Sequence, residues 1–366
     1  MDQNSEFDEV PAIRTAAGIG LKENVKVAFV TIPDRGLRIG GARLQIEKTA
    51  EHLRQLGVEV RLYSPWEDSL EGVDVCHIFQ AHWSVHPYCV TAKGRGIPVV
   101  ISPIFNTASS PAWFLRNVVH YACRIPGVCV SHRLVEEMLQ NADALLPLGE
   151  SERKFLLGAI PGLDPSRLHV VPNGTEQRFA DATPHAFVEK FGFAPDVVFV
   201  GRIDDNKNLL TVIRALRGTG LRIAAIGSGE GMFERYVEQC RREGEGSVTF
   251  VGRLPHGDPL LASAYAASKV FVLPSLSELF PVSAMEAGLA GCRIVITTNS
   301  AIGSALGDDA VYVNPRRSND WRNAILREHK NERNTALSRR LLTQYTWPGI
   351  AGRIADVYNL AVSRGS

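Results

Sequence analysis

Short apolar runs of the kind found in buried strands alternate with amphipathic, helix-like stretches along most of this chain. The run Lys26–Ile32 is followed by a helical pattern over Ala42–Leu56, which stops at Gly57, and then by another apolar run over Val58–Tyr63. Continuous apolar runs are typical of parallel strands, and their alternation with helices predicts a parallel sheet flanked by helices. Further strands are predicted in this half at Val73–Phe79, Val99–Ser102, Ala144–Pro147 and Leu168–Val171.

The alternation breaks at a proline-glycine segment, Val171–Thr175, and resumes after Pro195. Two such halves joined by a hinge predict an α/β protein with two facing doubly wound domains and an inter-domain cleft. We expect a flexible tail over residues 1–22, a first domain over 23–172, a second domain over 173–346 and a final helix over 347–362. In the second half the pattern predicts strands at Val197–Gly201, Leu221–Ile226, Val248–Val251, Val270–Leu273, Arg293–Thr297 and Ala310–Val313, and helices at Leu209–Leu216, Met232–Arg242 and Val282–Ala290.

The composition narrows the range of partners. With 40 basic and 39 acidic residues the formal net charge is +1, which argues against a nucleic-acid binder. No apolar run reaches the length of about 18 residues that spans a bilayer, and the polar first 20 residues do not resemble a signal peptide. We therefore expect a cytoplasmic protein, soluble or at most attached to the inner face of the membrane.

Two smaller features bear on the same question. The segment Trp113–Gln140 carries arginines among apolar residues, a pattern that suits either a membrane-surface face or an ordinary core helix with snorkelling arginines. The cysteines are scattered without a C-x-x-C pair, which indicates reduced thiols and neither a disulfide framework nor a zinc site. They are Cys76, Cys89, Cys123, Cys129, Cys240 and Cys292.

The strongest candidate site is the segment Ser277–Gly288, which follows the predicted strand Val270–Leu273. Ligands of open parallel sheets bind beyond the carboxyl ends of the strands. The loop carries Glu278, and Glu286 follows in the predicted helix, for which Pro281 suits the first turn. A carboxylate can accept hydrogen bonds from two neighbouring hydroxyls, as in a sugar or a ribose. For a lone glutamate, a solvated surface residue is the better explanation, but the apolar neighbours of Glu286 and the loop position of Glu278 weaken that explanation here.

A second strand-to-helix turn, Gly201–Asn208, contains Arg202 and Lys207. Cations at a helix N-terminus favour a diphosphate, although the two cations are also explained by balance with the neighbouring acidic residues. Gly40 and Gly41, before the first helix, leave backbone amides open to a phosphate.

Two further patterns argue against other activities. Gly227–Gly231 resembles part of a dinucleotide fingerprint, but Met232 stands where the final glycine belongs, so a dehydrogenase is disfavoured. His77, His82 and His86 have no spacing typical of a metal site, and no metal is expected.

Taken together, these segments resemble the family of glycosyl transferases group 1. The resemblance lies in Val-Gly-Arg at 200–202 with Lys207, in the glutamate pair Glu278 and Glu286 with seven residues between them, and in several shorter segments. The shorter segments are Gly-Ser-Gly at 227–229, Val-Gly-Arg-Leu at 251–254, Leu-Pro-Ser at 273–275 and Val-Pro-Asn-Gly at 171–174.

The resemblance implies two Rossmann-like domains of the GT-B type, with the second domain binding a nucleotide diphosphate sugar as substrate and no cofactor. It implies that Glu286 holds the ribose hydroxyls and Glu278 those of the transferred sugar. The diphosphate would lie against Arg202 and Lys207 in place of a metal ion. In the same way it places Arg253 and Leu254 near the base, the amide of Val282 at the sugar or phosphate, and Gly40 and Gly41 at the phosphate from the opposite domain. The final helix would cross back to the first domain.

Two positions depart from the family pattern. Pro281 removes a backbone donor from a loop that often contains glycine. A histidine that many members place after the strand Val99–Ser102 is absent, so Asn106 in that loop or His82 in the neighbouring loop is the candidate replacement.

The implied function is a retaining, metal-independent glycosyltransferase of the hexosyltransferase type. It would extend a glycan or lipid-linked acceptor in polysaccharide biosynthesis, with peripheral membrane contact left open. The alternatives are a sugar-nucleotide epimerase or phosphorylase on the same fold, and a catalytically inactive partner subunit.

Overall fold

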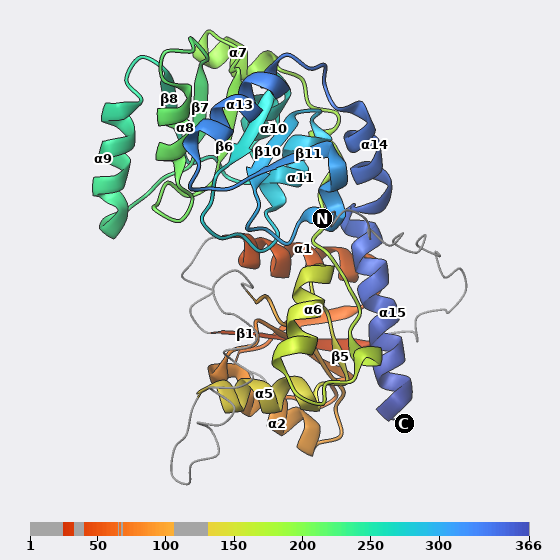
Figure 1. The fold of residues 1–366 in the computed structure, drawn as a ribbon. Coiled ribbons are helices and arrows are strands. Elements are labelled where there is room, and N and C mark those ends of the chain that lie inside the picture. The colour runs from red at the N-terminus through yellow and green to blue at the C-terminus, as the bar shows by residue number, and fades with distance from the viewer. Residues whose placement is uncertain (1–24, 33–39, 65, 67–68, 106–130, 366) are drawn as a thin grey trace, which may run out of the picture.

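The computed structural model describes residues 25–32, 40–64, 66, 69–105 and 131–365. These residues form two α/β domains, each a parallel sheet with flanking helices (Figure 1). The expected tail 1–22, Asn106, Cys123, Cys129 and most of Trp113–Gln140 lie outside these described residues. The remaining cysteines, Cys76, Cys89, Cys240 and Cys292, are buried free thiols.

The first sheet has five parallel strands in the order β2-β1-β3-β4-β5. Its inner strands are mostly apolar and buried on both faces, as parallel strands require, whereas the edge strand β2 is partly exposed. They are β1 (Lys26–Thr31), β2 (Glu59–Leu62), β3 (Val75–Phe79), β4 (Val99–Ser102) and β5 (Ala144–Leu145), and the helices are α1 (Gly41–Gln55), α2 (His86–Gly94), α5 (Ser131–Asn141) and α6 (Glu150–Ala159).

The second sheet has six parallel strands in the order β11-β10-β9-β6-β7-β8. Its strands are β6 (Val197–Val200), β7 (Ile223–Ile226), β8 (Val248–Gly252), β9 (Val270–Leu273), β10 (Arg293–Thr297) and β11 (Ala310–Val313). Its helices are α7 (His185–Phe191), α8 (Leu209–Leu216), α9 (Glu234–Glu243), α10 (Pro259–Ala267), α11 (Val282–Leu289), the short α12 (Gly303–Leu306), α13 (Ser318–His329) and α14 (Thr335–Gln344).

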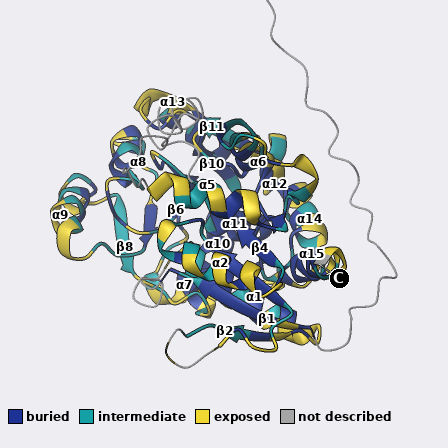
Figure 2. Ribbon diagram, turned by 90° about the horizontal axis from the view of Figure 1, so that it is seen from below, coloured by how far each residue is buried: buried dark blue, intermediate teal, exposed yellow. Residues whose placement is uncertain are grey.

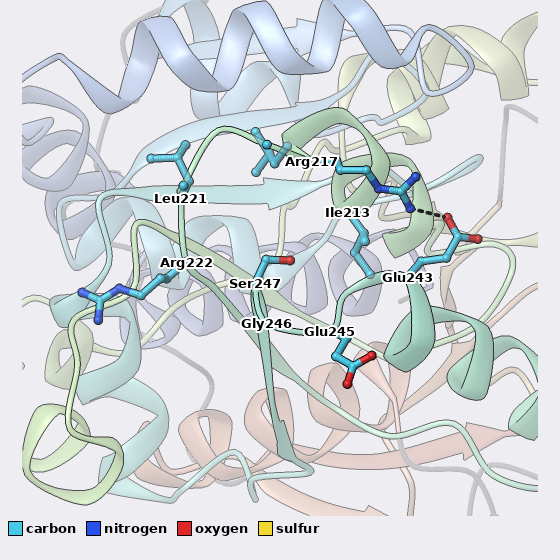
Figure 3. A pocket seen from close by; sticks show the side chains of 11 residues that line it. Ile213, Arg217, Leu221, Arg222, Glu243, Glu245, Gly246 and Ser247 are labelled. Carbon is cyan, nitrogen blue, oxygen red and sulfur yellow. Dashed lines mark hydrogen bonds and ion pairs between the residues drawn. The ribbon is translucent and has the colours of Figure 1, made fainter.

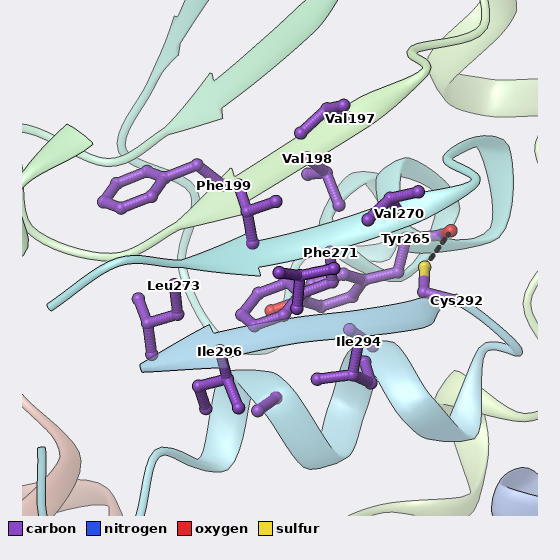
Figure 4. Packing of buried hydrophobic residues seen from close by; sticks show 14 of the residues in the cluster. Val197, Val198, Phe199, Tyr265, Val270, Phe271, Leu273, Cys292, Ile294 and Ile296 are labelled. Carbon is purple, nitrogen blue, oxygen red and sulfur yellow. Dashed lines mark hydrogen bonds between the residues drawn. The ribbon is translucent and has the colours of Figure 1, made fainter. Parts of the chain in front are cut away.

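The core of the second sheet is apolar on both faces. Its outer helices, such as α9 and α13, have exposed faces (Figure 2). Side chains from β6, β9 and β10 interdigitate around Phe271, and Tyr265 of α10 lies beneath them (Figure 4). The thiol of Cys292 donates to the Tyr265 carbonyl at 3.1 Å, so the start of β10 is tied to the end of α10. The predicted α/β fold with two doubly wound sheets is confirmed.

Two predicted elements are wrong in detail. Leu168–Val171 does not form a strand of the sheet. Leu168 makes an isolated parallel bridge to Leu145, and the amides of His169 and Val171 donate to the carbonyls of Leu145 and Pro147, before the chain turns into the hinge. The predicted helix Met232–Arg242 is divided into a 3-10 turn, Gly231–Phe233, and helix α9.

The final helix α15 (Trp347–Gly365) lies against α1 and the first sheet (Figure 1). Its Tyr358 hydroxyl is 2.6 Å from Nδ1 of His77 on β3, and the other ring nitrogen of His77 is 2.9 Å from Ser102 Oγ on β4. One buried imidazole therefore links two strands to a helix that lies about 280 residues further along the chain.

His77 gives the protein a defined acid sensitivity. Burial lowers the pKa of His77 from 6.5 to about 3, so below pH 6.5 the unfolded chain binds a proton that the folded chain refuses. The free energy of unfolding therefore falls as the pH drops below 6.5, and the loss due to His77 reaches about 2 kcal/mol at pH 5. We expect His77→Gln to remove this part of the slope of unfolding free energy against pH, measured by urea titration. His185→Gln, at an exposed histidine, is the control, and a His77→Gln slope equal to that of the parent would contradict the prediction.

The two halves are joined by two crossing segments that hydrogen-bond to each other. The amide of Thr175 donates to the Tyr345 carbonyl at 2.7 Å, and the amide of Trp347 donates to the Thr175 carbonyl at 3.2 Å. A Cβ added at Gly174 would lie 2.6 to 2.8 Å from ring and backbone atoms of Trp347, which is itself buried. The glycine is therefore required by the close approach of the two segments.

Gly174→Ala is expected to lower the free energy of unfolding by about 1–3 kcal/mol, because the new methyl group overpacks the crossing. Gly352→Ala on α15 is the matched control, since a Cβ there meets nothing within 4 Å. Urea unfolding of both variants measures the difference. If both variants are as stable as the parent, the crossing is not tightly packed in solution.

Candidate active site

Both sheets reverse their strand order at one point, where open parallel sheets form a crevice beyond the carboxyl ends of the strands. In the second sheet this point lies between β6 and β9. The loop after β6 carries Arg202 and Lys207, and the loop after β9 carries Glu278. Tertiary structure thus brings together two segments that are separated by about 70 residues in sequence.

Lys207 and Glu278 meet directly at this switch point. The ammonium group of Lys207 donates to Oε1 of Glu278, and Ser275 Oγ donates to the same oxygen at 2.7 Å. The side chains are 21% and 10% exposed, so the pair is largely but not fully withdrawn from water. The two predicted residues form one polar unit, which the sequence alone did not specify.

Arg202 lies beside the same loop with its guanidinium more than half exposed. Its Nε donates to the buried carboxylate of Asp204, whose second oxygen accepts the Lys207 amide at 2.7 Å. Asp204 therefore shapes the loop that presents both cations, while the Arg202 side chain stays more than half exposed. The guanidinium also lies over the ring of Phe233, 5.4 Å from its centroid.

The backbone of the loop that carries Glu278 forms hydrogen bonds with three neighbouring segments. The amide of Glu278 donates to the Asn299 carbonyl at 2.9 Å, and the side chain of Asn206 donates to the Ser277 carbonyl at 3.1 Å. From the hinge, Asn173 lies 3.5 Å from the Phe280 carbonyl. Pro281 precedes α11 as its N-cap, so the prediction that it lies in the first turn is wrong by one residue, and Val282 begins the helix as a buried residue.

Glu286 lies about one turn into α11 and is almost fully buried. Its Oε1 lies 2.8 Å from Nε2 of His256, and its Oε2 accepts a hydrogen bond from the Tyr265 hydroxyl at 3.0 Å. Burial, reinforced by the negative Glu286, raises the pKa of Tyr265 well above its usual value, so the hydroxyl stays a donor. A buried carboxylate needs such partners, and sequence reasoning identified neither of them.

Arg253 and Leu254 lie in the loop after β8, two or three residues before His256. Arg253 is exposed and Leu254 is half-buried against the core of the second sheet. His256, which follows in the same loop, contacts Glu286. Among the described contacts, neither Arg253 nor Leu254 touches Glu286 directly.

The first sheet has its own switch point, between β1 and β3. Gly40 and Gly41 follow β1 and open helix α1, and a Cβ at either position would meet nothing within 4 Å, so the helix start is uncovered. His82 follows β3, but its ring accepts the Ser84 amide and caps a short 3-10 turn. Asn106 is outside the described residues, so the choice between Asn106 and His82 stays a prediction.

A buried carboxylate that the sequence did not single out organises the loop after β4. Glu152 on α6 accepts the amides of Phe105 and Leu148 at 2.7 Å each. Burial raises the pKa of Glu152 to about 7, although these backbone hydrogen bonds act in the other direction. The neighbouring Ile104 has φ of 55°, a left-handed conformation that costs about 1–3 kcal/mol. Glu152 thus supports a strained loop at the face of the first domain toward the second.

The first domain touches the second near the glutamate loop. A Cβ at Gly149, before α6, would lie 2.9 Å from the Ala301 carbonyl, and the Ala301 amide in turn donates to the Leu279 carbonyl at 2.8 Å. The candidate site therefore lies where the two halves meet. Within the described ranges, no set of three or more histidine, cysteine, aspartate or glutamate side chains is placed to hold a metal ion.

A separate hollow lies at the other edge of the second sheet, by the starts of β7 and β8 (Figure 3). Arg217 and Arg222 project around it, and Glu243 is already paired with Arg217 and Arg214. None of the predicted site residues lines it, so we do not assign the site there. In the parts of the chain that the structure describes, no helix combines the length and apolarity needed to cross a bilayer.

Comparison with known proteins shows which sequences this chain is similar to. Residues 194–331 match the family model of glycosyl transferases group 1. The chain is 29% identical over 208 residues to the D-inositol 3-phosphate glycosyltransferase of Rhodococcus erythropolis, which covers 52% of this chain and 46% of that protein. The chain thus spans about half the length of the curated relatives that it matches.

Solved structures extend the likeness to both halves. Sucrose-phosphate synthase from Thermosynechococcus elongatus superposes with a TM-score of 0.72 at 18% identity, covering 93% of this chain and 99% of that one. HepE of Anabaena, solved in complex with UDP, gives a TM-score of 0.71 at 16% identity, covering 92% and 100%. These define the fold as that of two-domain, GT-B-type proteins. The match of residues 194–331 to the model of glycosyl transferases group 1 confirms the resemblance that the motifs of this half predicted.

Proposed function

We propose that this protein transfers a sugar from a nucleoside diphosphate sugar to a hydroxyl of an acceptor. The observation that carries the proposal is the meeting of Lys207 with Glu278, beside Arg202, at the switch point between β6 and β9. A cation beside a hydroxyl-accepting carboxylate suits a donor whose diphosphate and sugar lie next to each other. Proteins similar to this chain include a D-inositol 3-phosphate glycosyltransferase and, in fold, a protein crystallised with UDP.

In the proposed reaction the bond between the anomeric carbon and the diphosphate oxygen breaks and its electron pair leaves with the nucleoside diphosphate. A new bond forms between the anomeric carbon and the acceptor oxygen, and the acceptor proton passes to the departing diphosphate. The transition state has oxocarbenium character. Lys207 and the exposed guanidinium of Arg202 stabilise the charge that develops on the diphosphate.

Several finer features belong to the same proposal. Retention of the anomeric configuration, by attack on the face from which the diphosphate departs, follows from the family resemblance, and we assign no protein nucleophile. The two cations take the place of a metal ion, and no cofactor takes part. The acceptor is a glycan, a lipid-linked sugar or a sugar phosphate, and a role in polysaccharide biosynthesis at the cytoplasmic face of the membrane agrees with this range.

The first experiment tests donor binding. UDP-, GDP- and ADP-sugars are screened by thermal unfolding, since a ligand at a hundred times its Kd stabilises the folded state by about 2.7 kcal/mol. The donor that binds is then incubated with and without acceptors, inositol phosphate and lipid-linked sugars among them. We expect the nucleoside diphosphate to be released only when an acceptor is present.

The alternatives give different results. An epimerised sugar nucleotide without acceptor indicates an epimerase, and release that depends on inorganic phosphate indicates a phosphorylase. If no nucleotide sugar shifts the unfolding temperature and none is turned over, the chain is a catalytically inactive partner subunit and the proposed function is wrong.

A further inference from the structure

The carboxylate of Glu286, which we propose binds the nucleotide, is already hydrogen-bonded to two side chains of the protein. Nε2 of His256 and the hydroxyl of Tyr265 each contact one oxygen of Glu286. An ionised carboxylate offers about four acceptor sites, so two stay available for ligand hydroxyls. Because a carboxylate only accepts, Nε2 of His256 carries the proton of its contact. The direction in which Glu286 presents its free lone pairs is therefore set by His256 and Tyr265 together.

His256 is in turn fixed from its other side. Its Nδ1 lies 3.6 Å from a carboxylate oxygen of Glu176, which belongs to the segment directly after the hinge. The guanidinium of Arg178 donates to the His256 carbonyl, and the ring of Phe179 lies edge-on to the imidazole at 5.9 Å. The imidazole thus has little freedom to turn away from Glu286.

Glu176 connects this cluster to the first domain. Its carboxylate lies 2.7 Å from the ammonium of Lys48 on α1 and 2.8 Å from Nε of Arg178. Burial acts to raise the pKa of Glu176, but the hydrogen bonds from Lys48 and Arg178 outweigh it and the pKa is lowered. For Lys48, burial acts to lower the pKa, but the contacts with Glu176 and Glu51 raise it. The two directions agree on an ionised pair between the halves.

The helix that carries Lys48 is also the one that begins at the exposed Gly40 and Gly41. Lys48 lies about two turns from that start, and a helix is rigid over such a length. The position of Lys48 therefore sets the position of the helix start. A continuous polar chain runs from α1 through Glu176 and His256 to Glu286.

We propose that His256 is a positioning residue for Glu286, and that Glu176 and Lys48 extend this positioning to helix α1 of the opposite domain. Nucleoside diphosphate affinity then depends on residues that make no contact with the nucleotide. The inference rests on the proposed function, because it assumes that Glu286 receives the nucleotide.

The test uses the full chain and calorimetric titration with UDP, GDP and ADP. We expect His256→Ala to weaken binding of the accepted nucleotide about tenfold, the effect of losing one charge-assisted hydrogen bond. His256→Gln, whose amide reaches the position of Nε2, should bind within about threefold of the parent. His256→Asn keeps only the nitrogen nearer to Glu176 and should resemble His256→Ala. In turnover, the change should appear in KM and leave kcat nearly unaltered.

The extension to α1 is tested by Lys48→Met, which keeps the aliphatic stem. We expect binding to weaken about threefold and this effect to vanish in a Glu176→Gln background, as a double-mutant cycle requires. Lys93→Met is the matched control, since Lys93 forms an ion pair of similar length with Asp143 elsewhere in the same domain. Thermal unfolding of each variant verifies that it is folded.

The possible failures are distinguishable. If the parent binds none of the three nucleotides and turns over no donor, the proposed function and this inference both fall. If the parent binds and a folded His256→Ala binds equally well, the inference alone is wrong. If Lys48→Met matches Lys93→Met, the link to α1 is refuted.

Discussion

A Lys207→Met variant is expected to lose about 10²- to 10³-fold in the rate of sugar transfer, the effect of removing one preorganised group from a developing negative charge. In the structure Lys207 is the cation that contacts Glu278, and both side chains are largely withdrawn from water. An electrostatic interaction there is less screened than at the surface. The measurement is kcat for release of nucleoside diphosphate at saturating donor and acceptor.

Two further variants test whether the loss is due to the charge at position 207. Lys207→Arg keeps the charge and should retain more activity than Lys207→Met. Lys269→Met removes an exposed lysine at the opposite end of the same sheet, just before β9, and should leave kcat unchanged. If Lys207→Met has the kcat of the parent, the diphosphate does not lie at the switch point between β6 and β9.

A Glu286→Ala variant is expected to weaken nucleoside diphosphate binding about a hundredfold, since a carboxylate that accepts two ribose hydroxyls contributes charge-assisted hydrogen bonds. The substitution also leaves the buried donors of His256 and Tyr265 without their acceptor. Calorimetry with UDP, GDP and ADP measures the loss. Inorganic pyrophosphate, which has no ribose, should bind the variant and the parent alike.

The control for this variant is Glu243→Ala, which removes a carboxylate from the hollow at the other edge of the sheet. Its ion pairs with Arg214 and Arg217 have no connection with the candidate site, so nucleotide binding should not change. Equal losses with nucleotide and with pyrophosphate in Glu286→Ala would mean that the site has collapsed, and the assignment of the ribose would then fail.

The strands of both sheets were predicted closely from sequence because each is a short apolar run bounded by polar or glycine-containing turns. Val99–Ser102, Val270–Leu273 and Arg293–Thr297 have the predicted bounds. Leu168–Val171 has the same composition but leads into the hinge, and its pairing with the backbone of residues 145–147 stays at one isolated bridge and two amide hydrogen bonds. An apolar run predicts burial, and only the surrounding backbone decides whether it pairs.

The candidate site was predicted unevenly. The turns after β6 and β9 were found from sequence because any parallel sheet presents such turns at one edge, and the charged residues stand out there. His256, Tyr265 and Glu176 were missed, since each is an isolated polar residue whose partner in this cluster lies 21 to 80 residues away in sequence. No local pattern distinguishes such a residue from a surface residue.

By itself, therefore, the sequence determined which segments are strands, where the hinge lies and which turns carry Arg202, Lys207 and Glu278. These properties follow from local composition and period, which act over a few residues. Tertiary structure alone decided the order of the strands, and that order makes β6 and β9 neighbours and brings Lys207 against Glu278. It also decided that Glu286 is held by His256 in a polar chain reaching α1, because burying a carboxylate requires partners that only the packed fold supplies.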